Sequence, residues 1–138
     1  MTQLEKLMAF VRSFPRWEEQ PLQVDTTGAA PVNAGIFPLG EEILERREDV
    51  LGHVRIYCRS RYQLLRCCDR GNGQADAQWL QDFQQWVRQC SATGTAPAFG
   101  DDPAQEKLRA EKGALRTPEQ ADSAVYAVTI TAEYVKDY

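Results

Sequence analysis

Few residues of this chain could carry out chemistry, and their spacing does not favour it. His53 is the only histidine, and it falls on the polar side of an alternating, strand-like stretch. A catalytic imidazole needs a nucleophile and an orienting carboxylate beside it, and no motif here supplies them. The sequence also lacks a GxSxG elbow and a glycine-rich phosphate-binding loop. We therefore interpret His53 as a surface residue and predict no catalytic residues and no enzyme activity.

Metal and cofactor binding are equally poorly supported. The chain has four cysteines, at Cys58, Cys67, Cys68 and Cys90. They lack the short paired spacings of zinc sites, so we expect reduced and mostly buried thiols. The pairs Glu41-Glu42 and Asp101-Asp102 could bind a hard cation or act as acid and base. Neighbouring carboxylates in loops are usually solvated, so we predict neither a metal site nor a cofactor.

One surface pattern is typical of protein interfaces. The polar side of the strand-like stretch carries Arg55, Tyr57, Arg59 and Arg61. Arginine and tyrosine are enriched where proteins meet. The acidic segment 41–49 could supply a complementary patch through Glu41, Glu45 and Glu48. Opposite charges steer an encounter and fix its register. We predict that these residues form an oligomer interface.

Composition excludes several classes of protein. The chain has 138 residues with 16 basic and 20 acidic side chains, a net charge of −4. This length predicts a single domain over residues 1–138. Sequence-specific nucleic-acid binding is disfavoured because it needs a strong basic field. No apolar run approaches the roughly 20 residues that span a bilayer. Residues 1–14 carry charges inside their apolar pattern, unlike a secretory signal, so we expect a cytoplasmic protein without membrane contact.

Two amphipathic helices are predicted from apolar residues that repeat every three or four positions. The first covers residues 2–14, with Thr2 as its cap and Glu5 at the capping-box position. The second covers residues 75–90, where Trp79 and Trp86 share one face. We expect both tryptophans to belong to the core rather than to a ligand site.

Strands are predicted at residues 22–25, 34–39, 52–60, 107–115 and 123–135, with a bulge at Gly113. Residues 61–68 suggest a short helix, and turns are expected at 26–28, 69–73 and 117–119. For residues 41–49 the composition favours a helix. A polar tip between Ile43-Leu44 and Val50-Leu51 would also suit a long hairpin. The order of elements predicts an α+β fold with an antiparallel sheet.

Several segments together resemble a known family. They are Leu4-Glu5-Lys6-Leu7 with Ser13-Phe14-Pro15, the hairpin entering 54–59, Leu80-Gln81-Asp82-Phe83-Gln84-Gln85-Trp86-Val87, the loop 95–100 and the last strand 124–134. In their order and spacing the chain resembles small minor capsid proteins of siphophages and prophages of Gram-positive bacteria. These are similar to phage tail terminators.

The resemblance implies a tail-terminator-like fold. It would have an antiparallel or mixed sheet of four to five strands, helices packed on one face, and a hairpin at 41–49. It also implies a structural virion protein that forms a hexameric ring at the tail–head junction. Its partners would be the tail tube and the head–tail connector, with assembly in the host cytoplasm. The alternatives are a head-completion or neck connector protein, or an interaction domain unrelated to phage.

Overall fold

The computed structural model describes residues 2–17, 20–24, 33–69, 73–115 and 123–138. In chain order the elements are α1 (Gln3–Arg12), β1 (Leu22–Val24), β2 (Asn33–Glu48), β3 (Val54–Asp69), α2 (Gly73–Thr93), the short 3-10 helix η1 (Pro103–Gln105), β4 (Lys107–Leu115) and β5 (Ser123–Asp137).

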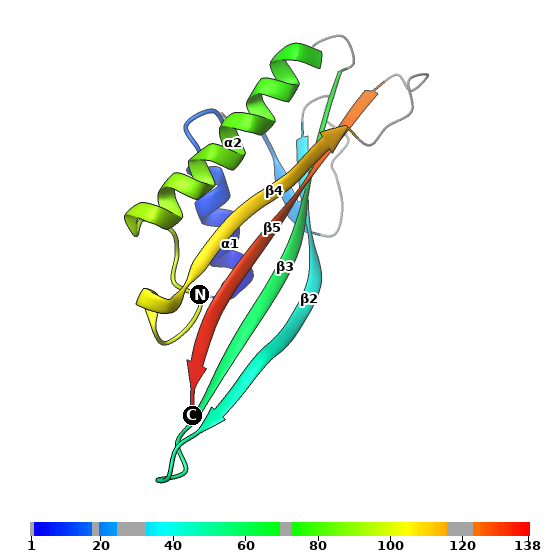
Figure 1. The fold of residues 1–138 in the computed structure, drawn as a ribbon. Helices are drawn as coiled ribbons and strands as arrows, with labels where there is room; N and C mark the ends of the chain where they lie inside the picture. The colour runs from blue at the N-terminus through cyan, green and yellow to red at the C-terminus, as the bar shows by residue number, and fades with distance from the viewer. Residues whose placement is uncertain (1, 18–19, 25–32, 70–72, 116–122) are drawn as a thin grey trace.

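The described strands form one mixed sheet in the order β1-β2-β3-β5-β4. β1 runs parallel to β2, and every other neighbouring pair is antiparallel. Both α-helices lie on the same side of this sheet (Figure 1). The expected α+β fold, with helices on one face of a mixed sheet, is confirmed.

Apolar stripes of the two helices meet the covered sheet face to form the core. Leu7 and Val11 of α1 and Phe83 of α2 are fully or almost fully buried, as are Leu64 of β3 and Ile130 of β5. The helix periodicity thus predicted the buried face of each helix. Trp79 is buried as expected and Trp86 is half-buried, and Phe10, which lies outside the predicted stripe, is also buried. At the start of α1, Thr2 Oγ1 accepts the backbone N–H of Glu5 at 3.1 Å, as the capping spacing predicts.

The predicted short helix at 61–68 is wrong, because β3 continues through it as a strand. Tyr62, Leu64 and Cys68 are buried at alternate positions along this segment. β3 is a central strand that pairs with β2 on one side and with β5 on the other. Those non-local hydrogen bonds override the weak helix preference. Cys67 and Cys68 therefore point to opposite faces of the sheet.

Residues 41–49 form a hairpin limb rather than a helix. β2 runs unbroken to Glu48, so the segment that was expected as a separate strand at 34–39 is only its first half. Two irregularities, between Pro38 and Gly40 and between Ile43 and Glu45, interrupt its pairing with β3. We call residues 41–60 the arm. The arm, with the end of β5 beside it, projects past both helices (Figure 1).

The bulge expected at Gly113 is confirmed. The register between β4 and β5 shifts between Glu111 and Ala114, and Lys112 takes a left-handed φ of 61°. A Cβ on Gly113 would come within 2.7 Å of the Leu80 side chain, so any other residue here would have to displace the Leu80 and Gln84 side chains of α2. The turns expected at 26–28 and 117–119 lie outside the described residues, as does most of that expected at 69–73.

Candidate assembly interface

The predicted basic patch lies on the sheet face that the helices leave uncovered. Cys58, Ser60 and Tyr62 of β3 are buried on the helix side. Since side chains alternate along a strand, the intervening residues point the other way. These are the predicted interface residues Arg55, Tyr57, Arg59 and Arg61.

Arg59 binds carboxylates from both neighbouring strands. Its Nη2 lies 2.9 Å from Glu133 Oε1 on β5, and its Nη1 lies 3.1 Å from Glu42 Oε1 on β2. Arg61 reaches the same Glu42 oxygen at 3.4 Å. Partial burial by itself would raise the pKa of Glu133. The hydrogen bond from Arg59 and the charges of Arg59 and Arg109 outweigh burial and lower that pKa.

Arg55 is held in the same way nearer the end of the arm. Its Nε and Nη2 donate to the two oxygens of Asp137 at 2.8 and 3.0 Å, a bidentate pair. Its Nη1 lies 3.2 Å from Asp102 Oδ2, next to η1. The hydrogen bond from Arg55 lowers the pKa of Asp137. Arg55 thus ties β3 both to β5 and to the loop before β4.

The three predicted acidic interface residues do not form one patch. Glu45 binds Arg47 at 2.8 Å, and that guanidinium lies over the Tyr57 ring at 5.2 Å. Glu48 binds Arg46 at 3.3 Å. Glu41 is in register with Ser60, whose side chain points to the helix side. The acidic and basic side chains that were expected to meet between two copies therefore already pair with each other within the arm of one copy.

A polar cluster around Tyr134 lies within the sheet. Burial, together with a smaller contribution from Glu41, raises the pKa of Tyr134 to about 12, while hydrogen bonds with Ser60 and Gln3 lower it by less. The Tyr134 and Ser60 hydroxyls lie 2.9 Å apart. This polar cluster marks the place where the covered part of the sheet ends and the arm begins. The Tyr134 phenol stays protonated at neutral pH, so Tyr134 contributes a hydrogen bond within the fold.

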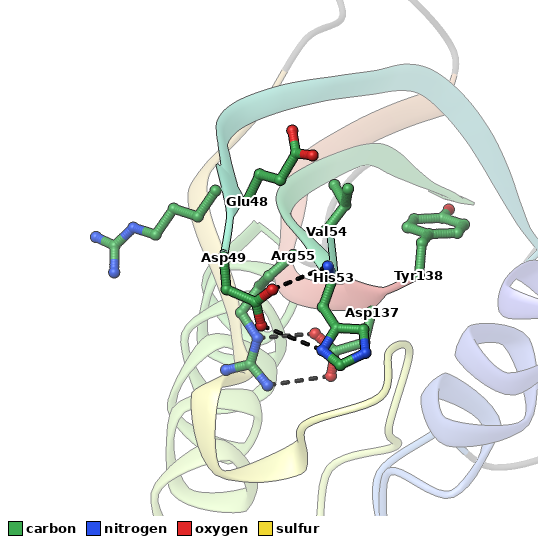
Figure 2. A pocket seen from close by; sticks show the side chains of 8 residues that line it. Glu48, Asp49, His53, Val54, Arg55, Asp137 and Tyr138 are labelled. Carbon is green, nitrogen blue, oxygen red and sulfur yellow. Dashed lines mark hydrogen bonds and ion pairs between the residues drawn. The ribbon is translucent and has the colours of Figure 1, made fainter. Parts of the chain in front are cut away.

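The tip of the arm is a tight turn built on Asp49. Asp49 Oδ1 accepts the backbone N–H groups of Leu51 and His53 at 2.9 and 3.0 Å. Its Oδ2 lies 3.1 Å from His53 Nδ1 (Figure 2). Gly52 takes a φ of 86°, which glycine adopts without strain. His53 thus lies in this turn, just before β3, and not on the strand where it was expected.

A shallow hollow of about 580 Å³ lies beside this turn, between the arm and the end of β5 (Figure 2). Asp49, His53, Arg55 and Tyr138 are among its lining residues. His53 has a carboxylate partner, but no serine, threonine or cysteine lines the hollow. The arrangement therefore offers a hydrogen-bonded turn and no activated nucleophile.

Aliphatic side chains at the tip are the feature that the sequence patterns missed. Val50 is fully exposed and Leu51 is 79% exposed, and Ile43 on the side of the arm is 63% exposed. The available signal for an exposed apolar tip was the pair Val50-Leu51, which lies beside Gly52 within a run of charged residues. This pair is equally typical of a buried strand, because the alternation of the following strand continues into it.

Comparison with protein-family models finds no model that matches the chain, and comparison with curated proteins finds no matching protein. In the described ranges, no three histidine, cysteine or acidic residues are grouped closely enough to bind a metal ion. No helix in the same part of the chain has the length and hydropathy needed to cross a bilayer.

The four cysteines are free, and we expect their reactivity to follow burial. Burial and the neighbouring Asp76 raise the pKa of Cys68 to about 12, so its thiol should react slowly in the folded protein at neutral pH. Cys67 and Cys90 are only half-buried and should react first. Thiol titration should find four free groups in denaturant without reductant. Fewer than four, or fastest labelling of Cys68, would contradict this expectation.

Proposed function

We propose that this chain is a structural virion protein of a phage or prophage, a tail terminator or minor capsid protein that assembles as a ring at the tail–head junction. The single observation that carries the proposal is the arm. It is a rigid extension of the sheet, and its tip presents bare aliphatic side chains.

Strand pairing, with internal charge pairs across it, supports an extended arm. Arg55 and Arg59 connect β3 to carboxylates on the neighbouring strands. Because β3 pairs with β5 as far as Arg55 and Asp137, the arm and the end of β5 together form three hydrogen-bonded strands over most of the arm's length. Three strands hold a sheet far better than an isolated hairpin does. The arm is therefore ordered before any partner arrives, and binding need not order it.

The apolar tip supplies a reason to assemble. Burying one valine or leucine side chain stabilises a complex by about 1.5–3 kcal/mol. In a single copy Val50 and Leu51 contribute none of this, because they remain in water. An arm that contacts a different surface of its neighbour makes a heterologous contact, and such contacts close into rings when the rotation allows. This agrees with the resemblance to ring-forming tail proteins, whose tube and connector would then be the partners.

The unmodified chain tests the proposal directly. We expect a discrete oligomer by light scattering at high chain concentration, and ring-shaped particles by negative-stain electron microscopy. Raising the salt concentration should weaken the oligomer only partly, since Arg47, Arg55 and Arg59 of the arm are already paired with carboxylates of the same chain. A strict monomer at millimolar chain concentration and low salt would contradict the proposal.

A charge reversal tests whether the predicted basic face also takes part. Arg61 is about half exposed, and its one ion pair in the described residues is the long contact with Glu42. If the uncovered face touches a neighbour, Arg61→Glu should shift the mass toward monomer while the melting temperature stays nearly unchanged. Lys112→Glu, on the edge strand β4, is the control reversal. An equal effect of both variants would place the contact elsewhere.

A further inference from the structure

A small apolar hollow lies in the loop between α2 and β4. Its volume is about 110 Å³, and its apolar lining comes from Ala96, Pro97, Ala98, Phe99, Pro103 and Leu108. An engineered protein cavity of about 150 Å³ accommodates a benzene molecule. The hollow therefore has the size of one branched aliphatic side chain.

The loop that forms this hollow is held in place before anything binds. Glu106 Oε1 accepts the backbone N–H groups of both Phe99 and Gly100. Gly100 lies directly against the backbone of Val135, where a Cβ would collide with the carbonyl oxygen. Gln3 Nε2 of α1 donates to the Phe99 carbonyl at 3.2 Å. A hollow fixed from three directions is a preformed receptor rather than a gap between mobile residues.

Positive charges lie beside the hollow. Lys6 Nζ donates to the carbonyl of Ala98 at 2.9 Å, and Lys107 is both a lining residue and solvent-exposed. Neither lysine forms an ion pair with another of the described residues. At the tip of the arm, Glu48 and Asp49 directly precede Val50 and Leu51. Glu48 pairs with Arg46 and Asp49 with His53, but both carboxylates remain about half exposed and can also approach a lysine of a neighbouring copy. An apolar end with acidic neighbours complements an apolar hollow with basic neighbours.

We infer that Leu51 at the tip of one copy inserts into this hollow on the next copy, with Glu48 and Asp49 of the first near Lys6 and Lys107 of the second. The arm cannot fold back onto its own hollow, because β3 and β5 pair to its far end. The contact joins two different surfaces of the same chain and is therefore heterologous. This inference rests on the proposed function, namely that the chain assembles with itself.

Crosslinking between separately prepared variants tests the contact. Leu51→Cys places a thiol on the exposed tip, and Ala98→Cys places one at the exposed edge of the hollow. Mixing the two with a short bismaleimide should give several-fold more covalent dimer than either variant alone. The matched control mixes Leu51→Cys with Gln85→Cys, a position exposed on α2. It carries the same four native cysteines and thus measures their background.

A second pair of variants removes the insertion without new chemistry. Leu51→Asp should abolish assembly of the full chain, whereas Leu51→Met should preserve it. At a chain concentration low enough for all three proteins to be monomeric, their melting temperatures should agree, because Leu51 is 79% exposed in a single copy. Equal crosslinking in the test and control mixtures, or assembly by Leu51→Asp, would overturn the inference.

The outcomes separate this inference from the proposed function. A ring formed by the unmodified chain without selective crosslinking overturns the docking of Leu51 and leaves the ring proposal standing. Selective crosslinking within an open chain or a dimer supports the docking and overturns the ring. A strict monomer without selective crosslinking overturns both.

Discussion

Replacing Phe83 with alanine is expected to lower the free energy of unfolding by about 3–5 kcal/mol. Its side chain has no exposed surface, and it lies at the centre of an aromatic cluster that joins the two helices. Ring centroids of Phe14, Trp79 and Trp86 lie 5.3, 5.6 and 6.0 Å from that of Phe83. Truncation leaves a cavity that these large rings cannot close. Since a single domain has a total stability of about 5–15 kcal/mol, this loss removes a large fraction of it.

Chemical denaturation followed by tryptophan fluorescence measures this loss. Gln85→Ala is the matched control, because residue 85 lies two positions away on the exposed side of the same helix. It should change the unfolding midpoint very little. Trp86→Ala should fall between the two, since Trp86 is half-buried but stacks on Phe10 at 4.5 Å. Equal midpoints for Phe83→Ala and Gln85→Ala would mean that α2 presents a different face to the sheet.

Replacing Asp76 with alanine should destabilise the fold by a similar amount, about 3–5 kcal/mol, because it leaves the buried positive charge of Arg66 without its partner. Asp76 Oδ1 lies 3.0 Å from Arg66 Nη1, and the two side chains are only 9% and 14% exposed. The Cys68 thiol donates to the other carboxylate oxygen at 3.3 Å. Without the carboxylate, Arg66 would remain under α2 with the Trp79 ring at 4.5 Å as its main neighbour.

The double variant Arg66→Met with Asp76→Leu distinguishes a stranded charge from lost packing. Replacing both members of a buried ion pair with apolar groups is often neutral or stabilising. We therefore expect the double variant to regain most of the stability that Asp76→Ala loses, as measured by denaturant midpoints. If the double variant is as unstable as the single one, the pair contributes geometry that apolar packing does not replace.

The sequence predicted correctly those helices and strands whose apolar residues repeat with a regular period. The helix stripe through Trp79 and Phe83 and the alternation along 123–135 each describe an element whose buried face repeats regularly. Residues 61–68 and 41–49 carry weaker and conflicting signals. Residues 61–68 form a strand because β3 pairs with β2 on one side and β5 on the other, and residues 41–49 form a strand because β2 pairs with β3. A short window of sequence does not show such long-range pairing.

For the same reason, the sequence predicted only part of how the candidate interface residues are arranged. Alternation placed Arg55 and Arg59 on one exposed face. Their partners Asp137 and Glu133 belong to β5, at the far end of the sequence, and only the register of the sheet brings them together. A single sequence shows charges but not which of them neutralise one another. The preformed hollow at residues 96–108 likewise depends on contacts among α1, β5 and the loop that no local pattern contains.

The two irregularities in β2 bear on solubility. In the described part of the chain, β1 covers the outer edge of β2 only at residues 34–36, which leaves the rest of that edge without a pairing strand. A long flat edge of this kind invites strands of other molecules and promotes fibrous aggregation. Residues 39 and 44 fall at the irregularities, which twist the strand and interrupt its regular row of N–H and C=O groups. Deleting Leu44 would remove one irregularity and straighten the edge, and we expect the straightened edge to pair with strands of other molecules and promote fibrous growth.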